Sequence, residues 1–220
     1  MRTVLLSGFG PFGGESINPA GEAVARLDGR TIAETLVIAR ALPVVRRACI
    51  DAIVAQIREI DPAVVIGIGQ AGGRPEMTPE RVAINVDDYR IPDNAGNQPV
   101  DEPIVAGAPS AYWSALPIKA MVERMRGGGI PASVSNSAGT FVCNHLFFGL
   151  MHFLAGEGAV RRGGFIHIPY LPEQAARHPG EPSMGLTTIV RGLELAIEAV
   201  MTVLDRADHR DAPSARVTVT

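Results

Sequence analysis

"IPASVSNSAGTFVCNHLFFGLMHFLAGEGAVRRGGFIHI", residues 130–168, is the stretch of sequence that decides the fold. Two apolar segments of strand length, at 130–136 and 164–170, flank a segment with helical spacing at 140–156. A strand, a helix and a second strand in this order form a βαβ unit, whose two strands run parallel. We therefore expect a parallel sheet with a helix packed on its face.

The rest of the chain repeats this alternation. Further strand-length runs, rich in valine and isoleucine, occur at 3–9, 33–42, 63–69 and 81–86. Segments with helical spacing lie at 18–29, 44–60, 110–128 and 183–207. Because most of the strand runs are continuously apolar, helices are expected to cover both faces of the sheet. The sequence predicts a single-domain α/β fold with three layers, α/β/α, around a mostly parallel twisted sheet.

Two parts of the chain depart from this pattern. Residues 72–110 are dense in proline, glycine, aspartate and asparagine, which predicts an irregular functional excursion or a hairpin. The last residues, 208–220, are expected to form a flexible tail after a domain that spans 1–207.

Composition narrows the class of protein. The 220 residues include 20 Lys and Arg against 23 Asp and Glu, and the basic residues are scattered, which argues against a nucleic-acid partner. The apolar run "VLL" near the N-terminus is too short for a signal peptide or a membrane span. The two cysteines form no CxxC, metal-ligand or disulfide pattern. We expect a cytoplasmic, reduced protein with no membrane partner and no metal.

The unusual motifs follow the predicted strands. "GFGPFGG" (8–14), "GQAGG" (69–73) and "SAGTFVC" (137–143) each come after a strand, and His167 closes another. In open parallel sheets, ligands bind beyond the carboxyl ends of the strands. We therefore expect these loops to share one edge of the sheet and to bring Cys143 close to His167.

Cys143 has two interpretations. In the first turn of a helix, unpaired backbone N–H groups and the helix dipole stabilise a thiolate, which lowers a pKa that is about 8.5 in free cysteine. A nearby imidazole lowers it further, and the same N–H groups can hold an oxyanion. Alternatively, Cys143 fills the core among its apolar neighbours. Cys49, in the middle of a helical segment, is interpreted as a core residue.

The histidines are compared as candidate bases. His167 lies at a strand end; its alternative interpretation is a half-buried sheet histidine that bonds the backbone. His145 follows Cys143 by two positions, about 200° around the helix, so its side chain is expected to point elsewhere. His152 shares that helix, and His178 and His209 are interpreted as solvated.

A catalytic imidazole usually needs a third group that fixes its tautomer. Glu80 has the best context, because it lies between a glycine loop and a strand. Position alone does not choose between it and the other acids of the excursion, which also suit turns and helix caps: Asp87, Asp88, Asp93, Asp101 and Glu102.

The "GFGPFGG" loop does not match a phosphate-binding loop. It lacks the Lys-Ser/Thr ending of a P-loop, and no Lys or Arg occurs between Thr3 and Arg26. An apolar pocket is the better interpretation, with polar contacts from Asn18 and Gln70. Its expected walls are the aromatic rings of Phe9, Phe12 and Phe141, although these rings also suit simple packing beneath the loop.

Four blocks in the same order resemble one known family. They are "SGFGPFGGESINPA", "GQAGGRPEMTPERVAINVDDYRIPDNAGNQPVDEPI", "SNSAGTFVCNHLFFGLMH" and "GFIHIPYLPEQ". Together they resemble the pyroglutamyl peptidase I (pyrrolidone-carboxylate peptidase) family of cysteine peptidases. The resemblance implies an omega-peptidase that hydrolyses the amide bond after an N-terminal pyroglutamyl (5-oxoprolyl) residue of peptides, through a thioester acyl-enzyme and without a cofactor or metal.

The resemblance also assigns roles. It implies that Cys143 is the nucleophile, His167 the acid and base, and Glu80 the group that orients the imidazole. It places three phenylalanines around the lactam ring and three polar side chains near it: Phe9, Phe12, Phe141, Asn18, Gln70 and Arg90. It further implies a homodimer or homotetramer.

Three residues depart from the family pattern near the expected rim of the site, namely Pro75, Met77 and Tyr89. A second hypothesis is a small-molecule-binding α/β domain that keeps the pocket and lacks turnover. A low-pKa, alkylatable Cys143 distinguishes the enzyme from that binding domain.

Overall fold

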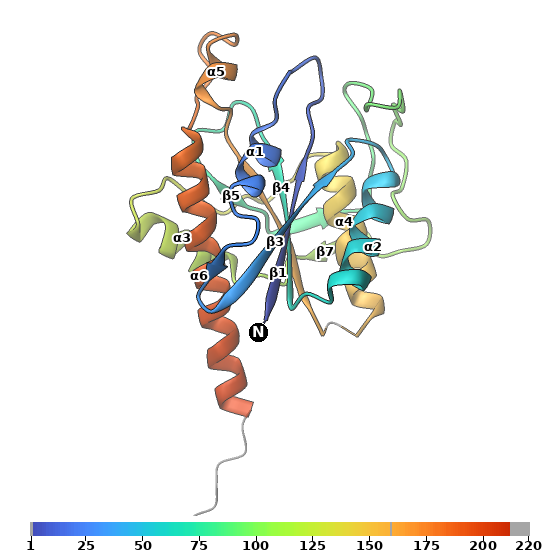
Figure 1. The fold of residues 1–220 in the computed structure, drawn as a ribbon. Coiled ribbons are helices and arrows are strands. Elements are labelled where there is room, and N and C mark those ends of the chain that lie inside the picture. The colour runs from blue at the N-terminus through green and yellow to red at the C-terminus, as the bar shows by residue number, and fades with distance from the viewer. Residues whose placement is uncertain (1, 159, 212–220) are drawn as a thin grey trace, which may run out of the picture.

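The central element of the computed structural model, which describes residues 2–158 and 160–211, is a six-stranded sheet with the order β2-β3-β1-β4-β8-β5. Strands β3, β1, β4 and β8 are parallel, and the short strands β2 and β5 pair antiparallel at the edges. This confirms the predicted mostly parallel sheet, which is strongly twisted (Figure 1). The strands are β1 (Thr3–Phe9), β2 (Thr31–Ile32), β3 (Thr35–Leu42), β4 (Val64–Gln70), β5 (Thr78–Pro79) and β8 (Arg162–Ile168).

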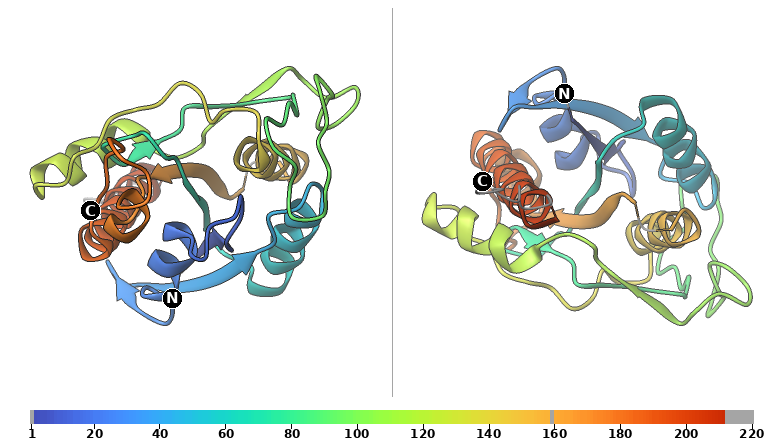
Figure 2. Two further views of the ribbon diagram at one scale, coloured as in Figure 1. Left: turned by 90° about the horizontal axis from the view of Figure 1, so that it is seen from above. Right: turned by 90° about the horizontal axis from the view of Figure 1, so that it is seen from below.

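Helices cover both faces of the sheet, as predicted. Helices α1 (Pro19–Ala25), α3 (Ile118–Gly127) and α6 (Leu186–Asp211) contribute to one buried apolar cluster. Helices α2 (Ala48–Ile60) and α4 (Val142–Gly156) contribute to a second cluster on the opposite face. Figure 2 shows these two sets of helices on either side of the sheet. The short helix α5 (Pro172–Ala175) lies beyond the strand ends.

Burial on both faces explains the apolar runs. The first six residues of β4 are buried, because helices pack above and below that strand. In α2, Cys49, Ile53 and Ile57 recur every four residues and are fully buried. Cys49 is therefore a core residue, as the sequence predicted.

The excursion contains a small second sheet. Strand β6 (Val82–Ile84) pairs antiparallel with β7 (Ala111–Trp113), so the strand predicted at 81–86 does not join the main sheet. The helix predicted at 110–128 begins only at Ile118. Pro117 ends the helix on its N-terminal side, because proline has no N–H for a helical hydrogen bond and its ring clashes with the preceding turn.

The predicted strand at 130–136 is the main error in the sequence analysis. This segment runs beside β5 and makes only isolated bridges, at Ala132 and Ser135. Pro131 has no N–H to donate to a ladder, and Ser135 exchanges side-chain hydrogen bonds with the Ser137 backbone. The segment is thus extended without forming a regular strand, and the predicted βαβ unit reduces to α4 followed by β8.

The C-terminal helix is longer than predicted. Helix α6 continues to Asp211, past the expected end of the domain at residue 207. The remainder of the expected tail, 212–220, lies outside the described residues. Over the residues that the structure describes, none of the helices has the length and apolar character needed to cross a membrane.

Candidate active site

A cavity of about 650 Å³ lies at the carboxyl ends of the parallel strands. Phe12 from the loop after β1, Gln70 at the end of β4, and Cys143 in the first turn of α4 all line it, together with His167 of β8. The structure therefore brings Cys143 and His167 to one cavity, although they are 24 positions apart and the first strand of the expected βαβ unit is missing.

The Cys143 sulfur lies directly above β4. A Cβ atom built on Gly69 would come within 2.8 Å of Cys143 Sγ, so only glycine allows this approach. Gly69 is also the residue that pairs across the sheet with His167. The α4 N-terminus has no side-chain cap, so its first backbone N–H groups are available beside the sulfur.

His167 is held by a buried carboxylate. Its Nδ1 lies 2.7 Å from Glu80 Oε1, and Glu80 is fully buried. The Glu80 backbone N–H donates to the Phe165 carbonyl at 2.9 Å, which fixes the acid next to β8. With Nδ1 engaged by Glu80, the other ring nitrogen of His167 is the one left for chemistry.

Burial sets the protonation states of this site. Burial and, to a smaller extent, the charge of Glu80 raise the pKa of the Cys143 thiol to about 12, although Arg74 opposes the rise. Burial also lowers the pKa of His167, against the opposing effect of Glu80. The sequence-based expectation of a lowered thiol pKa is therefore wrong, because desolvation is the largest influence on the thiol. Near neutral pH the resting pair is a thiol and a neutral imidazole.

Glu80 itself remains ionised. Burial acts to raise its pKa, but the hydrogen bond and the charge of His167, followed by hydrogen bonds from Ser135 and Arg74, outweigh burial and hold the pKa below its usual value. Arg74 is the residue that sequence reasoning missed: its Nη1 donates to Glu80 Oε1 at 2.7 Å. Its position six residues before Glu80, in the loop after β4, was the available signal, but only acids were weighed as partners of the histidine.

A small apolar pocket adjoins the cavity at Cys143. The rings of Phe12 and Phe141 lie 5.8 Å apart, centroid to centroid. This pocket contains five of the six predicted substrate-binding residues, and it adds two valines that the sequence analysis did not name: Phe9, Phe12, Asn18, Gln70, Phe141, Val44 and Val142.

The three polar candidates differ in their surroundings. Asn18 caps α1, since its Oδ1 accepts from the Ala20 N–H at 3.0 Å and its Nδ2 donates to the Gly10 carbonyl at 2.8 Å. Gln70 lines both the cavity and the small pocket, and its Oε1 accepts from Gln174 Nε2 at 2.9 Å. Arg90 lies on the exposed rim of the cavity and does not line the small pocket.

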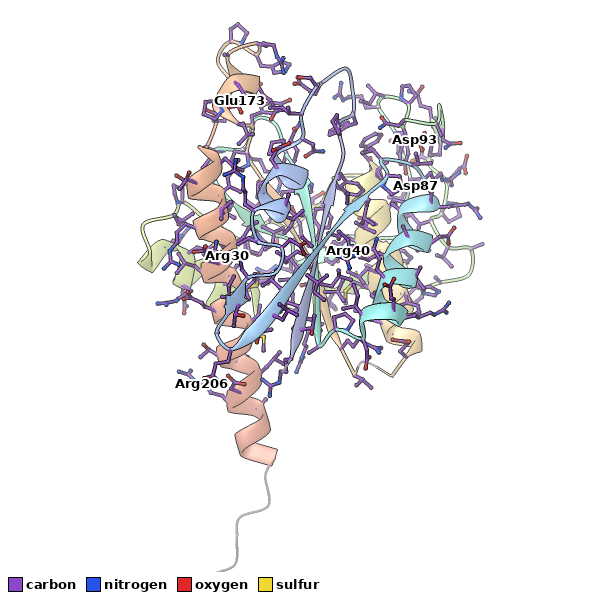
Figure 3. All side chains as sticks on the ribbon, viewed as in Figure 1. Arg30, Arg40, Asp87, Asp93, Glu173 and Arg206 are labelled. Atoms are coloured by element: carbon purple, nitrogen blue, oxygen red, sulfur yellow. The ribbon has the colours of Figure 1, made fainter. Side chains whose placement is uncertain are left out.

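The other acids of the excursion do not reach His167. Asp87 is fully buried and bonds His145 Nδ1 at 2.9 Å and Arg46 Nε at 2.7 Å. His145 thus points away from Cys143, as its position on the helix predicted. Asp93 accepts from the Arg46 backbone N–H at 2.7 Å, and Figure 3 shows Asp87 and Asp93 near one another beside the start of α2. Asp88, Asp101 and Glu102 are exposed.

One further wall of the cavity was not predicted. Tyr170 and His178 stack with ring centroids 5.1 Å apart, and both line the cavity. His178 Nε2 lies 2.7 Å from Glu15 Oε1, in the loop after β1. His178 lies in a loop and its side chain is 39% exposed, as predicted, but it also takes part in the cavity wall because the 170–184 segment folds back over the strand ends.

Within the described part of the chain, no group of three or more histidine, cysteine, aspartate and glutamate side chains is arranged to hold a metal ion. The site consists of a thiol, an imidazole, a carboxylate and a guanidinium beside a small apolar pocket.

Comparison with known proteins identifies the family. The family model described as pyroglutamyl peptidase matches residues 2–203. The chain belongs to the pyroglutamyl peptidase family. A pyrrolidone-carboxylate peptidase from Cupriavidus pinatubonensis is 62% identical over 204 residues, which cover 91% of this chain and 94% of that protein. A pyrrolidone-carboxylate peptidase from Bacillus cereus is 58% identical and covers 92% of this chain and 94% of its own length.

Solved structures agree with the pyroglutamyl peptidase family assignment. The crystal structure of pyroglutamyl peptidase I from Bacillus amyloliquefaciens matches with a TM-score of 0.89 at 49% identity, over 90% of this chain and 94% of that one. Pyrrolidone carboxyl peptidase from Thermococcus litoralis matches with a TM-score of 0.91 at 39% identity, over 94% of this chain and 96% of that one. The fold described above is the fold of this family.

Proposed function

We propose that this protein is a cysteine peptidase that hydrolyses the amide bond after an N-terminal pyroglutamyl residue. The observation that carries the proposal is the meeting of a small apolar pocket and a larger cavity at Cys143, with His167 on the cavity wall. Membership of the pyroglutamyl peptidase family supplies the reaction class.

Acylation begins with a neutral pair. Cys143 Sγ attacks the carbonyl carbon of the pyroglutamyl residue while its proton passes to the free ring nitrogen of His167. This order follows from burial, which disfavours a resting thiolate and a resting imidazolium alike. Glu80 accepts the Nδ1–H bond of His167 and stabilises the imidazolium that forms.

The tetrahedral oxyanion is held by the uncapped N-terminus of α4. Its first-turn N–H groups lie beside the Cys143 sulfur, and aligned N–H donors stabilise developing negative charge. His167 then gives its proton to the leaving amine, the C–N bond breaks, and a thioester remains. A water molecule, deprotonated by His167, attacks the thioester; the C–S bond breaks and the thiol regains its proton.

The apolar rings of Phe12 and Phe141, which line both the small pocket and the larger cavity, suit the lactam ring of the proposed substrate. Pyroglutamate is compact and uncharged, and the pocket walls are mainly apolar. The lactam N–H and C=O still need partners, since an unpaired buried polar group costs about 1 to 3 kcal/mol. Gln70 is the better placed of the two amide side chains, because both ends of Asn18 already bond the backbone.

The direct test compares wild type with Cys143→Ser. Wild type should release amine from a pyroglutamyl amide and leave the matching prolyl amide intact. An N-terminal proline carries a charged amine, which a mainly apolar pocket does not bind. The serine variant should lose at least about a thousandfold in kcat/KM. Absence of turnover by folded, reduced wild type would favour the binding-domain hypothesis. Assembly as a homodimer or homotetramer and location in the cytoplasm stay predictions.

A further inference from the structure

Arg74 lies behind the proposed catalytic residues and outside their cavity. It lines a separate surface hollow, together with Thr78, Ser135 and Ser137, and it is absent from the lining of the cavity that holds Cys143. Its side chain is 30% exposed, whereas the side chain of Glu80 is fully buried between this hollow and His167. Arg74 therefore reaches the site through hydrogen bonds to other residues and through its charge, and not from the cavity itself.

A single oxygen of Glu80 contacts both Arg74 and His167. Glu80 Oε1 accepts from Arg74 Nη1 at 2.7 Å and lies 2.7 Å from His167 Nδ1. The second oxygen, Oε2, is buried and has no hydrogen-bond partner in the described part of the chain. With Arg74 removed, the carboxylate would keep the imidazole and the Ser135 hydroxyl as side-chain neighbours but would lose the cation that fixes Oε1. The carboxylate could then turn and carry the ring of His167 with it.

Arg74 also reaches the loop that leads to the nucleophile. Its Nη2 donates to the Ser137 carbonyl at 2.9 Å, and Nη1 also donates to Thr78 Oγ1 at 2.6 Å. Ser137 lies just before the turn into α4 and Cys143. The planar guanidinium of Arg74 thus links Glu80, strand β5 and the loop that leads to Cys143. A lysine cannot reproduce this geometry.

The charge of Arg74 acts on the same groups. The positive charge of Arg74 disfavours binding of an additional proton by the Glu80–His167 pair. The same charge favours the thiolate form of Cys143. Glu80 and Arg74 are the charged residues that act directly on Cys143 and His167. The ionisable side chains on the remaining cavity wall are Glu15, Asp88, Arg90, Tyr170 and His178.

We propose that Arg74 is a positioning residue, which holds the Glu80 carboxylate in place for His167 and ties it to the loop that carries Cys143. The inference rests on the proposed peptidase function. It adds a fourth residue to the site, one that no substrate atom touches.

The experiment uses Arg74→Gln, Arg74→Lys and the matched control Arg81→Gln. Arg81 also lies in the excursion, and its Nε donates to Asn136 Oδ1 of the neighbouring segment at 2.7 Å. Unlike Arg74, it is not among the residues that shift the pKa of Cys143 or of His167. For each protein, kcat and KM for a pyroglutamyl amide are measured from pH 4 to 10. The rate of Cys143 alkylation by iodoacetamide is measured over the same range, which requires no substrate.

We expect Arg74→Gln to lower kcat about 10- to 100-fold. Its acid limb of kcat/KM should move up by about one pH unit, and its alkylation profile should move to higher pH as well. Arg74→Lys should leave both pH profiles where they are in wild type but lower kcat, because lysine keeps the positive charge and lacks the planar set of guanidinium donors. Arg81→Gln should match wild type in all of these measurements.

Two results would overturn the inference: an Arg74→Gln protein with both pH profiles unmoved, or an Arg81→Gln protein with the same shifts. Should Arg74→Gln fail to fold, Arg74→Lys decides the matter, since a lysine variant with wild-type kcat excludes a positioning role for the planar guanidinium. If wild type does not cleave the amide, the proposed function fails, while the alkylation profiles still decide the effect of Arg74 on Cys143.

Discussion

At the scale of single residues, the site depends on desolvation more than on the helix dipole. Cys143 occupies the first turn of α4, yet burial raises its pKa, and burial lowers that of His167. The two effects favour the same neutral pair, in which the proton moves only when the carbonyl is in place. A protonated, half-buried thiol of this kind resists alkylation near neutral pH better than an exposed thiolate would.

The pH dependence of activity follows from this pair. The pKa of His167 is lowered from its ordinary value of 6.5, so the neutral base persists below that pH. We expect the acid limb of kcat/KM to lie below pH 6.5, with a loss of about tenfold per pH unit beneath it. A pH series with a pyroglutamyl amide measures this limb, and a limb above pH 6.5 would show that the imidazolium is the resting form.

The free energy of unfolding should also decrease as the pH falls. Because the pKa of His167 is lower in the folded protein than in the unfolded chain, the unfolded chain binds its proton first as the pH falls. The contribution of this group to the free energy of unfolding is therefore present above pH 6.5 and declines below it. Urea unfolding at several pH values, with His167→Gln as the control, separates this contribution from those of the carboxylates.

At the scale of elements, the start of α4 organises the excursion as well as the chemistry. Asn144, directly after the nucleophile, accepts from the Ile84 N–H at 3.0 Å and donates to the Ile84 and Val86 carbonyls at 2.9 and 3.1 Å. His145 accepts from the Arg47 N–H at 2.8 Å, at a residue whose φ of 63° is unusual for a side chain with a Cβ. Three consecutive residues of α4 thus serve the cavity, strand β6 and the start of α2.

Replacing Asn144 tests this organisation. Asn144→Ala would leave buried backbone groups of the excursion unpaired, which should lower the free energy of unfolding by about 3 kcal/mol. Asn94→Ala is the matched control, because Asn94 is exposed and its side chain donates to the Pro11 carbonyl at 2.9 Å; it should cost less than about 1 kcal/mol. Equal urea midpoints for the two variants would contradict the proposed role of Asn144.

At the scale of the whole molecule, segments from both ends of the chain close the cavity. Glu15, in the loop after β1, lies 2.7 Å from His178 Nε2 and accepts from Arg177 Nη2 at 2.5 Å. This contact joins the loop that carries Phe12 to the segment after β8, across about 160 positions of sequence. The wall of the cavity that these two segments form exists only when both of them are folded.

Loosening this contact should affect substrate binding first. Glu15→Gln removes the charge that both basic partners share, so we expect KM for a pyroglutamyl amide to rise about three- to tenfold with kcat changed less than twofold. Glu173→Gln, on exposed α5 near the same wall (Figure 3), is the control and should match wild type. A large loss of kcat with KM unchanged would place Glu15 in the chemistry and contradict this account.

The local pattern of the sequence predicted much of the fold. The continuously apolar runs identified the main parallel strands, and helical spacing identified five of the six helices in the described part of the chain, because both patterns follow from burial within one element. Errors arose where a partner far along the chain decides the outcome: 130–136 lacks a full ladder, and 81–86 pairs within the excursion.

The sequence by itself determined the order of the main parallel strands and of the helices that cover them, the edge of the sheet that holds the site, and Cys143 and His167 as candidates, because loops that follow parallel strands must share one edge. Only the tertiary structure decided that Glu80, and not Asp87, reaches His167, that Arg74 holds it, and that the thiol rests protonated. Hydrogen-bond partners and desolvation depend on atoms brought together from distant parts of the chain, and no local pattern records those distances.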